Sequence, residues 1–178
     1  MAYFHGSPIG GSTVLIPKVS EHGEALVYLT ERPEHALVYA VKPVPAPFSY
    51  YPYGFAPDGR PVYTEYFPDA LRLLYGGRRG YLYRVERLPE DGDVTGIRGV
   101  HTCRLPVAVD GVTAYDDLGM ALLAAADEGR ICLRRFAQVG EEERAKISHT
   151  LWRELREKTA DAEAKAQMHL FLQEHFPE

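Results

Sequence analysis

Alternating apolar and polar positions predict short strands along this chain, and each is followed by residues that favour a turn or a helix. Residues 3–7 and 26–30 predict two such strands, and the second leads directly into a helix predicted over 33–40. Pro8 has no backbone N–H and disfavours helix at Ser7, so the first strand must end there. Further strands are predicted at 53–55, 61–66, 80–86, 100–103, 106–109 and 130–136.

The sequence also predicts helices between and after these strands. A short helix is predicted over 70–75, where two glycines follow it. A second is predicted over 118–128, with Asp116 or Asp117 as its cap. The region 141–176 is predicted to be helical, with Ile147, Leu151 and Leu155 on one apolar stripe and a second apolar cluster near its end. Strands that alternate irregularly with helices predict an α+β fold in a single domain over 1–178.

An aromatic excursion at 43–68 interrupts the regular pattern. It opens with three prolines, which exclude a helix, and contains a turn signal at Asp58-Gly59. Its rings either stack on a planar ligand or pack as a lid over the sheet or the rim of a cleft. We expect an ordered lid, because exposed together they form an apolar patch rare on soluble monomers. The rings are Phe48, Tyr50, Tyr51, Tyr53, Phe55, Tyr63, Tyr66 and Phe67.

Composition narrows the class of partner. The net charge of −5 disfavours nucleic-acid binding, which requires clustered Lys and Arg to neutralise phosphates. No apolar run is long enough for a membrane span, and the first residues lack a signal-like core, so a cytoplasmic location is expected. Cys103 and Cys132 are expected to be buried reduced thiols. The histidines form no ligand cluster, so no metal site is predicted.

The two N-terminal strands carry a family resemblance. His5, Gly6 and Ser7 close the first strand, and Tyr28 lies in a Val-Tyr-Leu-Thr string that ends at Thr30 and precedes a helix. This arrangement resembles the ADP-ribosyltransferase superfamily, and most of all the small rifampin ADP-ribosyltransferases. The resemblance covers about the first forty residues. It implies a split antiparallel sheet with flanking helices and NAD as co-substrate. By the same resemblance, His5 binds the adenosine ribose, Tyr28 stacks on nicotinamide, and Gly6, Ser7 and Thr30 line the NAD site.

The family also uses an acidic residue, which stabilises positive charge as the nicotinamide–ribose bond breaks. Asp91, after the strand at 80–86, best matches the placement in the rifampin-type members, and Asp93 is a substitute. Glu65 is the competitor, because its aromatic surroundings can desolvate the carboxylate. Each of these acids can also be an ordinary turn former or an exposed strand residue.

Three functions therefore stay open. The first is NAD-dependent transfer of ADP-ribose to an unknown acceptor. The second is a non-catalytic module on the same fold that binds NAD, ADP-ribose or a protein. The third resembles the tRNA 2′-phosphotransferases, but that family needs several Arg and His residues at a phosphate site, and no convincing set is present.

Overall fold

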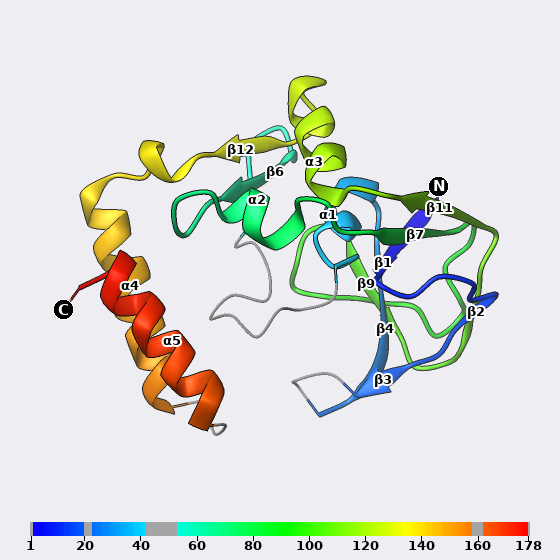
Figure 1. Ribbon diagram of the computed structural model, residues 1–178. Helices are drawn as coiled ribbons and strands as arrows, with labels where there is room; N and C mark the ends of the chain where they lie inside the picture. The colour runs from blue at the N-terminus through cyan, green and yellow to red at the C-terminus, as the bar shows by residue number, and fades with distance from the viewer. Residues whose placement is uncertain (1, 20–22, 42–52, 158–161, 178) are drawn as a thin grey trace. The chain divides into compact units, whose positions relative to one another are not determined.

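The structure is a computed structural model that describes residues 2–19, 23–41, 53–157 and 162–177 (Figure 1). The chain divides into two compact units. The first unit comprises Met1–Lys42 and Tyr75–Glu128, and the second comprises Pro43–Leu74 and Gly129–Glu178. Sheets and helices occur together, which confirms the predicted α+β class.

A seven-stranded sheet forms the centre of the first unit, and all its neighbouring strands are antiparallel. Its order is β11-β7-β1-β4-β9-β8, with β3 also paired to β4. The predicted strands at 3–7, 26–30, 80–86 and 100–103 all lie in it. The strands are β1 (Tyr3–Ser7), β3 (Lys18–Val19), β4 (Ala25–Thr30), β7 (Gly80–Val85), β8 (Asp93–Val94), β9 (Val100–Cys103) and β11 (Gly111–Tyr115).

One face of this sheet carries an apolar core. Side chains alternate along a strand, so β4 sends Val27 and Leu29 to one face and Tyr28 to the other. A two-stranded sheet of β2 (Val14–Leu15) and β10 (Val107–Ala108) adds apolar side chains to the core. The buried members of the core are Leu15, Val27, Leu29, Tyr83, Val85, Cys103 and Val107.

Helices α1 (Pro33–Leu37) and α3 (Leu118–Asp127) belong to the same unit. The α1 helix ends three residues earlier than the sequence predicts, and the chain continues as a turn. The α3 helix begins as predicted, because the carboxylate of Asp117 accepts a hydrogen bond from the backbone N–H of Met120 at 3.0 Å.

The second unit contains a three-stranded sheet of order β12-β6-β5. Its strands are β5 (Tyr53–Phe55), β6 (Pro61–Thr64) and β12 (Cys132–Arg134). The predicted hairpin at Asp58-Gly59 joins β5 to β6, whereas β12 runs parallel to β6. Its helices are α2 (Ala70–Tyr75), which ends at the unit boundary, a 3₁₀ turn η1 (Phe136–Gln138), α4 (Glu141–Glu157) and α5 (Ala162–His175). The α4 and α5 helices lie side by side (Figure 1).

The aromatic excursion and the helical C-terminal region thus share one unit. Tyr63 and Phe67 are buried in it. Phe48, Tyr50 and Tyr51 lie outside the described residues. The prediction of two buried thiols is half wrong: Cys103 is buried, but Cys132 is exposed on β12, which is an edge strand. No helix in the described part of the chain has the length and apolar character that crossing a bilayer requires.

Candidate functional site

The candidate site lies where strands β1 and β4 part. β1 pairs with β7 along its whole length, but it pairs with β4 at a single position, Phe4 opposite Thr30. Beyond that pair a side chain takes the place of the backbone partner: Nδ1 of His5 lies 2.9 Å from the carbonyl oxygen of Tyr28. The backbones of β1 and β4 therefore stop pairing beside Tyr28, and the imidazole of His5 joins the two strands there. We call this break in the pairing the β1/β4 opening.

The protonation of His5 follows from its surroundings. Burial lowers the pKa of His5 below its ordinary value; the hydrogen bond to Tyr28 opposes this shift, and the positive charge of Lys18 adds to it. The ring is therefore neutral at pH 7. A carbonyl only accepts, so Nδ1 must carry the proton and donate it to Tyr28. This tautomer leaves Nε2 with a lone pair that can accept a hydrogen bond from a ligand hydroxyl.

The structure brings His5 and Tyr28 together through the backbone of Tyr28. Its carbonyl holds the imidazole, so the two rings are within about 10 Å of each other by covalent geometry alone. Their side chains start from opposite faces, however. His5 stands opposite Tyr83, whose ring lies in the core with Leu29, whereas the adjacent Tyr28 points to the other face. A ligand that touches both residues must therefore enter the β1/β4 opening itself.

Asp93 lies in register with Tyr28. Thr102 of β9 stands opposite Tyr28 on one side and opposite Asp93 of β8 on the other. Directly opposed residues in antiparallel strands share a face, so all three side chains project from the face of Tyr28. The Cα atoms of Asp93 and Tyr28 are two strand spacings apart, about 10 Å. Asp93 is exposed.

Asp91 holds the end of β9. Its Oδ2 accepts hydrogen bonds from the backbone N–H groups of Arg104 at 2.6 Å and Leu105 at 2.8 Å. Its Oδ1 is buried and has no hydrogen-bond partner among the described residues. Burial, together with the charge of Asp91, raises the pKa of Cys103 to about 11, so this thiol stays protonated. Asp91 is thus fixed at one oxygen and unsatisfied at the other.

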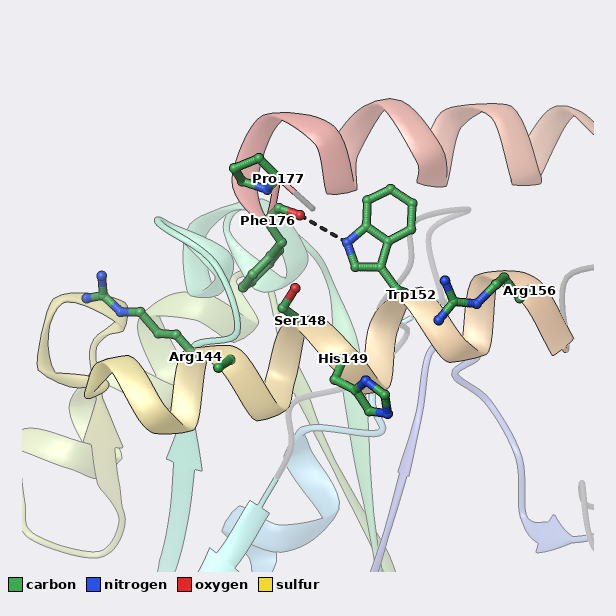
Figure 2. A pocket seen from close by; sticks show the side chains of 8 residues that line it. Arg144, Ser148, His149, Trp152, Arg156, Phe176 and Pro177 are labelled. Atoms are coloured by element: carbon green, nitrogen blue, oxygen red, sulfur yellow. Dashed lines mark hydrogen bonds between the residues drawn. The ribbon is translucent and has the colours of Figure 1, made fainter.

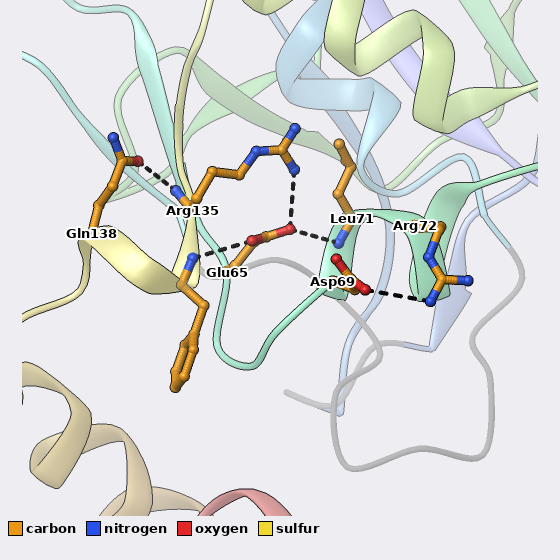
Figure 3. A network of polar contacts seen from close by, with 7 residues as sticks. Glu65, Asp69, Leu71, Arg72, Arg135 and Gln138 are labelled. Atoms are coloured by element: carbon orange, nitrogen blue, oxygen red, sulfur yellow. Dashed lines mark hydrogen bonds and ion pairs between the residues drawn. The ribbon is translucent and has the colours of Figure 1, made fainter.

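Glu65 belongs to the second unit and has a different environment (Figure 3). It is 5% exposed, so it is not the exposed strand residue that the sequence also allowed. Its Oε1 accepts from the backbone of Leu71 at 3.2 Å and from Arg135 at 3.1 Å, and its Oε2 accepts from the backbone of Phe136 at 3.1 Å. Both oxygens are therefore occupied, and the carboxylate joins three segments of this unit.

The other predicted ligand-binding residues make local contacts. Ser7 accepts a hydrogen bond from the backbone of Ile9 at 3.1 Å. Thr30 is buried and donates to the carbonyl of Arg32 at 2.7 Å, at the start of α1. Gly6 allows close packing on α1, since a Cβ there lies 1.9 Å from the carbonyl oxygen of Ala36. Gly6 therefore has a packing reason to be glycine, whether or not a ligand approaches it.

Sequence reasoning missed two neighbours of this region. Lys18 lies on β3 opposite Leu26, and its strand is only two residues long, which leaves no periodic signal. His101 bonds Glu31 through Nε2 at 2.9 Å, and its ring packs edge-on against Tyr3. The two partners are seventy residues apart, so only the pairing of β4 with β9 brings them together.

The second unit also contains cavities. One of about 490 Å³ lies between α4 and the end of α5, where the indole N–H of Trp152 donates to the carbonyl of Phe176 at 3.0 Å (Figure 2). Another of about 440 Å³ lies between the small sheet and α4, beside the ion pair of Arg134 and Glu143. Neither contains a residue that the sequence singled out as catalytic. The described residues include no group of three or more His, Cys, Asp or Glu able to hold a metal.

Comparisons of this chain with protein-family models, with curated proteins and with solved structures found no match.

Proposed function

We propose that this chain has an ADP-ribosyltransferase-like split sheet and transfers ADP-ribose from NAD to an acceptor of unknown identity. The observation that carries the proposal is the β1/β4 opening, where the imidazole of His5 bonds the carbonyl of Tyr28. The two residues singled out by the family resemblance, His5 and Tyr28, meet at this opening. A neutral histidine with a free acceptor nitrogen also suits a ribose hydroxyl.

The reaction breaks the bond between nicotinamide nitrogen and ribose C1′. An acceptor nucleophile forms a new bond to C1′ and loses its proton, and neutral nicotinamide leaves with the bonding electron pair. In this proposal Nε2 of His5 accepts a hydrogen bond from the adenosine ribose, and the ring of Tyr28 stacks on nicotinamide. A nearby carboxylate favours the positive charge that develops on the reacting ribose.

Asp91 is the acid in this proposal. Two backbone N–H groups fix its Oδ2, which orients the carboxylate, and its Oδ1 has no hydrogen-bond partner among the described residues. Preorganised groups of this kind stabilise transition-state charge without reorganisation. Asp93 is the substitute, because it shares the face of Tyr28. Glu65 is less suitable, since protein donors occupy both of its oxygens.

The test is NAD consumption with release of nicotinamide, measured beside NAD affinity. Asp91→Asn keeps an oxygen that can accept from Arg104 and Leu105 but removes the charge. We expect turnover to fall by roughly 10²-fold or more with little change in NAD affinity. Asp93→Asn is the matched control, and we expect it to retain turnover. Loss of turnover in Asp93→Asn alone reverses the assignment of the acid.

A second candidate is a non-catalytic module that binds NAD or ADP-ribose. The observation in its favour is that Asp91 ties down the chain after β9, which is a sufficient structural reason for its presence. Binding of NAD or ADP-ribose without turnover, across varied acceptors, selects this candidate. Wild-type protein that binds no NAD at millimolar concentration contradicts both.

A further inference from the structure

We propose that Lys18 binds the diphosphate of NAD at the β1/β4 opening, an inference that rests on the function proposed above. Lys18 lies on β3 directly opposite Leu26 of β4. Leu26 is two residues before Tyr28 on the same strand, so Lys18, Leu26 and Tyr28 project from one face of the sheet. Lys18 is therefore placed beside the residue assigned to nicotinamide.

The charge of Lys18 also reaches the residue assigned to the other end of the dinucleotide. Its positive charge is the smallest of the three contributions to the shifted pKa of His5, and it lowers that pKa. The diphosphate of NAD lies between its two riboses. A cation on the face of Tyr28 whose charge also acts on His5 is therefore placed to meet the diphosphate of the bound dinucleotide.

Lys18 is available for such a ligand. Two arginines of this unit are already paired: Arg104 with Glu24 at 3.1 Å, and Arg79 with Asp116 at 2.7 Å. The side chain of Lys18 is exposed and forms no hydrogen bond or ion pair with another described residue. An ammonium group with no carboxylate partner among the described residues suits phosphate oxygens, to which it donates charge-assisted hydrogen bonds.

The experiment compares three ligands by calorimetry: NAD, ADP-ribose, and nicotinamide riboside, which has no phosphate. In Lys18→Gln we expect affinity for NAD and ADP-ribose to fall about tenfold, and affinity for nicotinamide riboside to stay unchanged. Lys18→Arg keeps the charge and should restore most of the affinity. Lys165→Gln removes an equal charge from an exposed position on α5 and should change nothing.

A structural readout accompanies the binding data. Removal of the Lys18 charge should raise the pKa of His5, followed by NMR titration of its imidazole in the free protein. If wild type binds NAD and Lys18→Gln binds it equally well, the role of Lys18 is wrong and the proposed function stands. If Lys18→Gln loses as much affinity for nicotinamide riboside as for NAD, the inference is also overturned, because Lys18 then acts on the shape of the site and not on the diphosphate. If wild type binds no NAD, both proposals fail together.

Discussion

Gly6 of β1 and Ala36 of α1 lie so close that a Cβ on Gly6 is 1.9 Å from the Ala36 carbonyl oxygen. The obstacle is backbone, so it cannot move away as a flexible side chain does. Gly6→Ala should therefore lower the free energy of unfolding by about 2–3 kcal/mol. Urea unfolding checks this, with Gly96→Ala as control, because a Cβ at Gly96 meets open space. Equal stability of the two variants contradicts the close packing.

His35 should make the protein less stable in acid. Burial lowers its pKa to about 4 in the folded chain, against an ordinary value of 6.5. Between pH 6.5 and 4 the unfolded chain takes up a proton that the folded chain refuses, so the free energy of unfolding falls as pH falls. His35 lowers the free energy of unfolding by about 3 kcal/mol between pH 6.5 and pH 4. In unfolding measurements at pH 7, 5.5 and 4.5, the free energy of unfolding should fall less steeply with pH in His35→Gln than in the wild type. An equal fall in both proteins contradicts a buried neutral ring at His35.

Glu65→Gln should damage stability and leave NAD chemistry intact. Three donors converge on this buried carboxylate, and an amide has one acceptor oxygen to offer them instead of two (Figure 3). We expect a loss of about 1–3 kcal/mol, because the unsatisfied donors keep their desolvation cost. The measurement is thermal unfolding beside nicotinamide release at a temperature where the variant is folded. A folded variant with at least 10²-fold lower turnover assigns the role of catalytic acid to Glu65 instead of Asp91.

His5→Ala should weaken NAD binding about tenfold, the value of one hydrogen bond of ordinary strength. Tyr28→Phe is the matched variant, since a ring that only stacks does not need its hydroxyl. Affinity for NAD in the wild type should also drop in acid below the lowered pKa of His5, because a protonated Nε2 donates and no longer accepts. Calorimetry across pH tests both. Equal loss in Tyr28→Phe assigns a role to the tyrosine hydroxyl.

Local signals predicted much of the fold. The helix at Ala70–Tyr75 has the bounds that the sequence indicates, and Asp117 caps α3 with the predicted type of hydrogen bond. The strands β1 and β4 also follow from their apolar patterns. By contrast, β11 (Gly111–Tyr115) went unpredicted, because it is an exposed edge strand that buries no alternating apolar face. Its pairing with β7 is tertiary, and a single sequence carries no signal for it.

The candidate site was less accessible to sequence reasoning. His5 and Tyr28 were singled out by resemblance, but the hydrogen bond that joins them depends on where two strands separate. Lys18 and Thr102 reach the neighbourhood only through strand register. For Glu65 the sequence suggested a role that its contacts do not favour. Its aromatic neighbours in sequence indicated a catalytic acid, but hydrogen-bond donors from Arg135 and Phe136, about seventy residues later, occupy its carboxylate.

The two units are interleaved along the chain, and this has a consequence for synthesis. During translation the first unit is complete once Glu128 has emerged, while the second still lacks β12, which pairs with β6 about seventy residues earlier. The hairpin of β5 and β6 is therefore complete before its third strand, β12, is available. Long-range pairing of this kind slows folding and exposes apolar surface in the interval. A chain that ends between Glu128 and β12 therefore has a whole first unit, whereas its β6 has β5 on one side and lacks β12 on the other.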